Sequence, residues 1–185
     1  MRQCWSRLEL VLVAGLDRAA TERLVKELVA GGTPAESAPT IEDAVRSADI
    51  VCATTHADRP IVRRGWLGPG TDVDSVGYNS AGDGEVDGEV IRDSLIVVES
   101  RDAVLAPAPS GAVEIRRAIQ AGIVSPPTSS TRRSARSWPA SPRDVETTAA
   151  ITLYKSVGVA VQDAAAAMLV LQAAAATGAG ISIDL

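Results

Sequence analysis

The chain has 185 residues, of which 46% are apolar and 22% charged, and a formal net charge of −5. This length suits one ordinary domain with its own core, and the composition is that of a globular protein. The negative charge argues against a nucleic-acid partner, which requires a basic patch. The two cysteines and the single histidine show no metal-ligand spacing, so we expect no metal site.

The two ends of the chain show no targeting signal. Residues 1–7 contain no apolar core of the kind found in a signal peptide. The apolar run at 164–171 is shorter than the roughly 20 residues that span a bilayer. We therefore expect a cytoplasmic protein with reduced cysteines and no membrane partner.

The first half of the chain alternates apolar runs with helical patterns. Residues 8–15 are typical of a buried strand, and residues 18–30 follow with apolar positions at helical spacing. Thr40 is a good N-cap for a helix over 41–48. Further buried strands are predicted at 49–55, 72–77 and 94–100. This alternation favours an α/β fold of parallel βαβ units with helices on both faces.

The second half contains an unusual segment and an unusual helix. Residues 125–143 hold six serines, four prolines, four arginines and no acid, a composition that predicts a loop or a disordered segment. Residues 151–171 are apolar and rich in alanine, and we expect them to form a helix. Lys155, Ser156 and Gly158 interrupt its first half, where glycine costs about 1 kcal/mol relative to alanine.

Polar residues follow three of the predicted strands, and parallel α/β sheets bind ligands beyond the carboxyl ends of their strands. Asp17 follows the first strand and can bind a ribose hydroxyl, although a solvated turn residue is an equal alternative. Thr55 leaves the second strand, where its hydroxyl either binds a ligand or belongs to a polar turn. Gly77 lets a ligand approach the backbone after the third, ahead of Tyr78 and Asn79. No G-x-G-x-x-G phosphate loop follows a strand.

Four segments together resemble the ornithine cyclodeaminase/mu-crystallin family: ADIVCATTHADRPIV, WLGPGTDVDSVGYN, GEVD and ITLYKSVGVAVQDAAAA. The likeness covers most of residues 8–185. It implies a Rossmann-type domain that binds NAD or NADP, and a second domain that binds substrate and forms a homodimer. The implied activities are proline formation from ornithine, amino-acid dehydrogenation and ketimine reduction, with a small amino acid or cyclic imine as substrate.

The resemblance also implies roles for individual residues. Ser156 would contact the cofactor near its nicotinamide, and Val157 and Gly158 would lie beside the substrate. The expected helix start would offer free N–H groups and a positive dipole end there. Thr55 and the turn over 76–79, which includes Val76, Gly77 and Tyr78, would line the cofactor pocket.

Two further positions bear on the chemistry that the resemblance implies. Asn79 occupies the place of the catalytic aspartate of the cyclodeaminases, and an amide cannot act as a general base. Leu16 stands where NADP-using relatives often have arginine, which favours NAD and makes Asp17 a candidate for the ribose.

The chain departs from the family pattern in two places. The family's substrate domain, basic carboxylate clamps, first strand and glycine loop would all precede Leu8, and residues 125–143 replace a helix. These departures suggest a truncated or locally frame-shifted product, with the absent strand between 8–15 and 49–55. We expect a partial NAD(P)-binding domain over 1–145 with a truncated, doubly wound parallel sheet. A long helix and a terminal strand over 146–185 would return towards the substrate and dimerisation domain.

The sequence leaves two classes of function open. The first is an NAD(P)-dependent cyclodeaminase or amino-acid or imine oxidoreductase. The second is a catalytically inactive remnant or a non-catalytic nucleotide-binding module. Turnover of ornithine, alanine or a cyclic imine would distinguish them.

Overall fold

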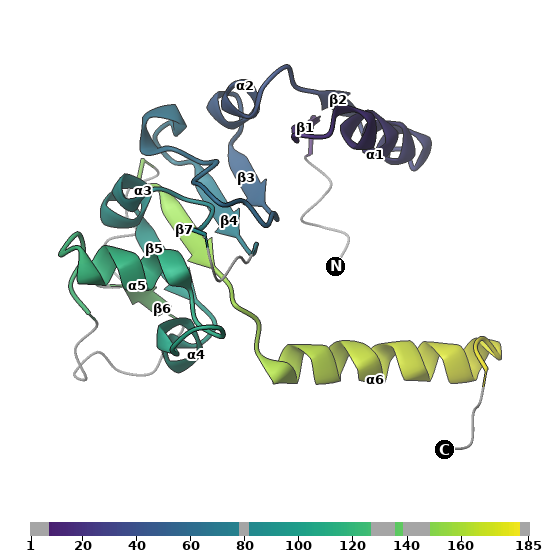
Figure 1. The fold of residues 1–185 in the computed structure, drawn as a ribbon. Helices are drawn as coiled ribbons and strands as arrows, with labels where there is room; N and C mark the ends of the chain where they lie inside the picture. Colours follow the sequence, from purple (N-terminus) through teal and green to yellow (C-terminus); the bar gives the residue numbers. More distant parts are fainter. Residues whose placement is uncertain (1–7, 78–81, 127–135, 139–148, 182–185) are drawn as a thin grey trace.

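Two sheets built on parallel strands organise the protein (Figure 1). The computed structural model describes residues 8–77, 82–126, 136–138 and 149–181. β1 (Val11–Val13) and β2 (Ala35–Ser37) form a two-stranded parallel sheet that packs against helix α1 (Arg18–Ala30). The other five strands form a second sheet, so the expected α/β class is confirmed.

The five-stranded sheet places its parallel strands with their carboxyl ends on one edge. Its order is β3 (Ile50–Ala53), β4 (Asp72–Ser75), β7 (Thr152–Lys155), β5 (Leu95–Val98) and β6 (Arg136–Trp138). The first four are mutually parallel, whereas β6 runs antiparallel to β5. β6 belongs to the segment 125–143, for which composition predicts a loop or disorder, so that expectation is wrong at these three residues.

The helices that cover this sheet lie on one of its faces. They are α2 (Ile41–Arg46), the 3₁₀ helix η2 (Arg64–Trp66), α3 (Gly88–Asp93), α4 (Arg101–Leu105) and α5 (Val113–Gln120). Their apolar residues share a core with Val73, Ile96 and Leu153 of the strands. On the opposite face Cys52 is exposed and Asp74 is half-buried. We expected helices on both faces; the described residues leave this second face open.

The helix expected over 151–171 is wrong in its first half. Thr152–Lys155 is strand β7, and α6 spans Ala160–Thr177. The sequence from Ile151 to Tyr154 is rich in β-branched and aromatic residues, which favour a strand once neighbouring strands are available to pair. Lys155, which would interrupt a helix, is therefore the buried last residue of a strand.

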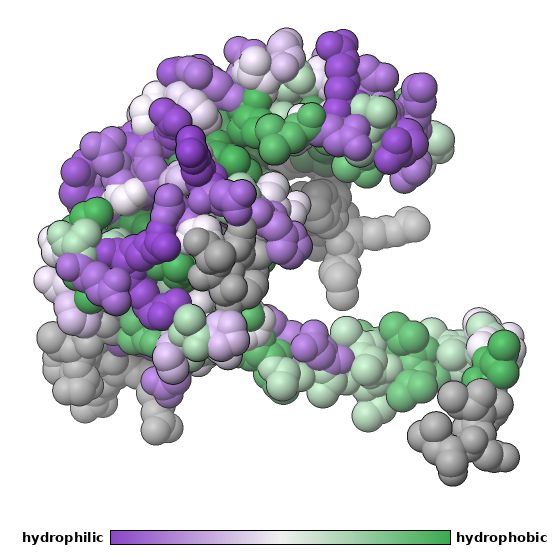
Figure 2. Space-filling view, in the orientation of Figure 1, coloured by the Kyte–Doolittle hydropathy of each residue, from purple (hydrophilic) through white to green (hydrophobic). Residues whose placement is uncertain are grey.

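Helix α6 extends away from the sheet, and none of its residues is buried (Figures 1 and 2). Its exposed apolar side chains include Val161, Met168, Leu169, Val170 and Leu171. By length and composition α6 could cross a membrane, with 18 residues and a mean hydropathy of 1.3. A single helix of this kind is weak support for a membrane span, because core helices of soluble proteins have the same character.

β1 and β3 belong to different sheets. Among the described residues, β1 pairs with β2 alone and β3 pairs with β4 alone. Within the described residues, each of these two strands therefore has one edge that is not hydrogen-bonded to another strand. This break lies where the sequence predicts that a strand is absent.

Candidate functional site

The candidate site lies at the carboxyl edge of the five-stranded sheet. Thr55 follows β3, Gly77 follows β4 and Ser156 follows β7. Because β3, β4 and β7 are adjacent and parallel, their ends lie side by side. We call these residues, together with Val76, Val157 and Gly158, the strand-end site.

A buried carboxylate joins the first two strand ends. Glu85 is 2% exposed. It accepts hydrogen bonds from the N–H and hydroxyl of Thr55, the latter at 2.9 Å, and from the Ser75 hydroxyl and the Gly77 N–H, both at 2.8 Å. A Cβ at Gly77 would collide with the Glu85 carboxylate and the Thr55 carbonyl oxygen. Glycine is therefore required at 77 to let Glu85 reach both strands.

A buried lysine joins β7 to the same cluster. Nζ of Lys155 donates to the Ser75 hydroxyl at 3.2 Å and to the Gly77 carbonyl oxygen at 3.0 Å. It also lies 2.9 Å from Oε1 of Glu114, in ion-pair contact without hydrogen-bond alignment. The Lys155 and Glu114 side chains are 1% and 3% exposed, so each charge is compensated inside the core.

A second carboxylate holds the turn after β7. Oε1 of Glu99, which follows β5, accepts from the Ser156 hydroxyl at 2.8 Å and from the N–H groups of Val157 and Gly158 at 3.0 and 2.8 Å. The free N–H groups that we expected at this turn are therefore engaged within the protein. Oε2 of Glu99 is buried and has no hydrogen-bond partner.

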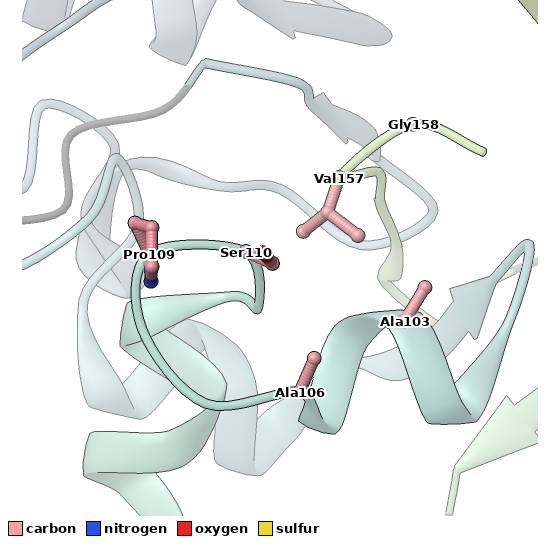
Figure 3. A pocket seen from close by; sticks show the side chains of 6 residues that line it. All are labelled: Ala103, Ala106, Pro109, Ser110, Val157 and Gly158. Carbon is pink, nitrogen blue, oxygen red and sulfur yellow. The ribbon is translucent and has the colours of Figure 1, made fainter. Parts of the chain in front are cut away.

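A shallow apolar cavity of about 340 Å³ lies beside the same turn (Figure 3). Val157 and Gly158 form one side, and α4 with the segment after it forms the other. The lining residues are Ala103, Ala106, Pro109, Ser110, Val157 and Gly158. Cavities of this size take small ligands. Gly158 has a φ of +76°, a conformation that glycine adopts without strain.

The open face of the sheet carries a separate group of titratable side chains. Cys52 on β3 lies opposite Asp74 on β4, with Sγ 3.9 Å from Oδ2. Burial raises the pKa of the Cys52 thiol, and the nearby charges of Asp74 and Asp72 raise it further. Burial, followed by the charge of Asp72, also raises the pKa of Asp74. Among the described residues, no group of three or more His, Cys, Asp or Glu is placed to hold a metal ion.

The structure brings together most, but not all, of the residues that the sequence singled out. Asp17 lies between β1 of the separate two-stranded sheet and α1, and its side chain caps α1 by accepting from the Ala20 N–H at 2.9 Å. Val76 is 45% exposed at the end of β4. Tyr78 and Asn79 lie outside the described residues. The roles of all these residues in binding stay predictions.

Sequence reasoning missed the two carboxylates that organise the site. Glu99 lies at the end of the strand predicted over 94–100, and the rule that selected Asp17 at a strand end would have selected it too. Glu85 offers no comparable signal, because its partners Thr55 and Ser75 are 30 and 10 residues away in the sequence.

A parallel α/β sheet with polar and glycine residues at the carboxyl ends of adjacent strands defines a Rossmann-like protein of the ligand-binding kind. The chain belongs to the ornithine cyclodeaminase/mu-crystallin family, whose model matches residues 2–178. The resemblance found in the sequence is thereby confirmed.

Individual relatives support the same assignment. Ketimine reductase mu-crystallin of Mus musculus is 32% identical over 130 residues, which cover 70% of this chain and 37% of that protein. Alanine dehydrogenase of Archaeoglobus fulgidus is 29% identical over 136 residues, which cover 73% of this chain and 40% of that protein. The solved structure of Thermococcus litoralis Δ1-pyrroline-2-carboxylate reductase in complex with NADH and L-proline is 26% identical. It has a TM-score of 0.75 and covers 95% of this chain and 53% of that one. The chain thus spans about half or less of the length of these relatives.

Proposed function

We propose that this chain supplies the nicotinamide site of an NAD(P)-dependent oxidoreductase that acts on a small amino acid or cyclic imine. The observation that carries the proposal is the alignment of Thr55, Gly77 and Ser156 at three adjacent strand ends. A relative with the same fold was solved with NADH and L-proline. When bound, the cofactor would supply or accept the hydride that passes between its nicotinamide and the substrate carbon.

The residues present fit the nicotinamide end of such a cofactor. Gly158 leaves the backbone open to a flat ring, because no atom lies where its Cβ would stand, and Val157 offers an apolar surface beside the cavity. The N–H groups at the strand ends are engaged by Glu85 and Glu99, so they are not available to a pyrophosphate. We assign the nicotinamide, and not the phosphates, to the strand-end site.

We further propose NAD as the preferred form of the cofactor. Leu16 is 97% exposed in the turn between β1 and α1, next to Asp17. An apolar side chain there gives no cation for the 2′-phosphate of NADP, whereas the free oxygen of Asp17 can accept from a ribose hydroxyl. Tighter binding of NADH than of NADPH in parallel titrations supports this choice, and the reverse order contradicts it.

Substitution of Ser156 tests the cofactor site. Ser156→Ala removes a hydroxyl that Glu99 holds at the turn, and we expect it to weaken NADH binding about three- to tenfold, as one lost hydrogen bond does. The measurement is the fluorescence of reduced cofactor during titration. The control is Ser134→Ala in the segment 125–143. Equal and undiminished affinity in both variants would remove Ser156 from the site.

A second candidate function is that of a catalytically inactive remnant or a non-catalytic nucleotide-binding module. The separation of β1 from β3 favours an inactive chain, because a Rossmann-type cofactor site depends on a continuous sheet. Cofactor binding without turnover of alanine, ornithine or a cyclic imine would support this alternative.

Peptides from residues 125–143 that match an intact reading frame would reject the hypothesis of a frame-shifted product.

A further inference from the structure

The strand-end site directs its hydrogen-bond donors at carboxylates of the protein itself. Glu85 takes the N–H groups of Thr55 and Gly77, and Glu99 takes those of Val157 and Gly158. Three hydroxyls from the strands and their ends donate to the same two carboxylates. An anionic ligand would therefore meet occupied donors and two negative charges.

Both carboxylates act only as acceptors in this arrangement. Every polar group bonded to Glu85 or Glu99 is an N–H or a hydroxyl that donates, which is the pattern of an ionised carboxylate. Both carboxylates are therefore placed to attract a positive charge.

Two cations of the described residues already have carboxylate partners. Lys155 is paired with Glu114. Arg117 on α5 is paired with Asp83. Because each of these pairs is neutral as a unit, neither pair offsets the charges of Glu85 and Glu99.

We propose that Glu85 and Glu99 give the strand-end site a preference for positive charge, so that they strengthen binding of the oxidised, cationic nicotinamide relative to the reduced, neutral ring. This inference rests on the proposed cofactor site and adds its selectivity for oxidation state. In a medium of effective dielectric about 20, a unit charge about 10 Å away changes a binding constant roughly tenfold.

The test compares the affinities of NAD⁺ and NADH for the full chain by isothermal titration calorimetry. We expect Glu85→Gln and Glu99→Gln each to weaken NAD⁺ relative to NADH by roughly tenfold. The two cofactor forms differ at the nicotinamide alone, so general damage to the site lowers both affinities and leaves their ratio unchanged. A merely structural role for the carboxylates would therefore not move the ratio.

Asp49→Asn is the matched control. Asp49 is an exposed carboxylate directly before β3, at the opposite edge of the sheet. Asp49→Asn changes the net charge of the chain by the same amount as Glu85→Gln or Glu99→Gln. We expect the ratio of the NAD⁺ and NADH affinities to stay at the wild-type value.

The outcomes separate this inference from the function on which it rests. Absence of binding of either cofactor form to the wild-type chain would overturn the cofactor site and the inference together. Binding of both forms with the wild-type ratio retained in Glu85→Gln and Glu99→Gln would overturn the inference alone. Should Glu85→Gln fail to fold, Glu99→Gln decides, because Glu99 is half-buried at a turn outside the core.

Discussion

At the scale of single residues, the buried Lys155–Glu114 pair makes the clearest prediction. Lys155→Met keeps the apolar stem but leaves Glu114 charged and 3% exposed without a cation. Removal of one partner from such a pair typically costs about 3–5 kcal/mol of unfolding free energy. We expect a loss of this size in urea unfolding, and substantial recovery in the double variant Lys155→Met/Glu114→Gln. A double variant as unstable as the single one would show that the pair is not coupled.

Cys52 allows a test of the electrostatics on the open face of the sheet. Burial is the largest cause of its raised thiol pKa, and the charge of Asp74 is the next. Asp74→Asn removes that charge, so the thiol pKa should fall and the reactive thiolate should become more abundant near pH 8.

The measurement for Cys52 is the rate of iodoacetamide alkylation between pH 6 and 10 in a Cys4→Ser background. We expect the midpoint of the Asp74→Asn profile to move to lower pH. Asp163→Asn on α6 provides the control and should leave the profile in place. A midpoint for Asp74→Asn at or above that of the parent chain would contradict the account.

At the scale of secondary-structure elements, the sequence predicts those strands and helices that are favoured by the residues of the element itself, such as its capping residue. The cap of α2 is one example, because Thr40 accepts from the Asp43 N–H at 3.0 Å as expected. The sequence pattern wrongly predicts a helix at β7. The strand depends on pairing with β4 and β5, which are distant in the sequence. The site shows the same division. Thr55, Gly77 and Ser156 follow apolar runs, whereas Glu85 is defined by partners from distant strands.

Within the described part of the chain, β1 and β3 each have one edge without a pairing strand, and these edges make a prediction at this same scale. Free N–H and C=O groups along a strand edge are a template for pairing with another chain. We expect the isolated chain to self-associate and to lack a cooperative unfolding transition of a monomer. Light scattering during a thermal scan measures both properties.

Ile50 provides the means to test this cause of association. It is 60% exposed on β3, and Ile50→Lys places a charge at that edge, which should reduce association. Ile181→Lys is the control, since Ile181 is 91% exposed beyond α6 and belongs to neither sheet. A sharp unfolding transition of a monomeric wild-type chain would rule out open edges as a source of association.

At the scale of the whole molecule, charge bears on whether the chain assayed alone turns over ornithine. Ornithine brings a carboxylate to its binding site, and burial of that charge without a partner is costly. Glu85 and Glu99 hold the donors at the strand ends and repel a further anion. Lys155, the buried cation of this cluster, is already paired with Glu114.

We therefore predict that the 185-residue chain by itself does not convert L-ornithine to proline. Besides the unfavourable charge at the strand ends, the sequence resemblance implies that Asn79 stands in the place of the cyclodeaminases' carboxylate, and an amide cannot take the proton. The assay is ammonia release and proline formation from L-ornithine with added NAD. Proline clearly above the no-protein blank, and lowered by Ser156→Ala at limiting NAD, would show that this chain is a cyclodeaminase despite Asn79.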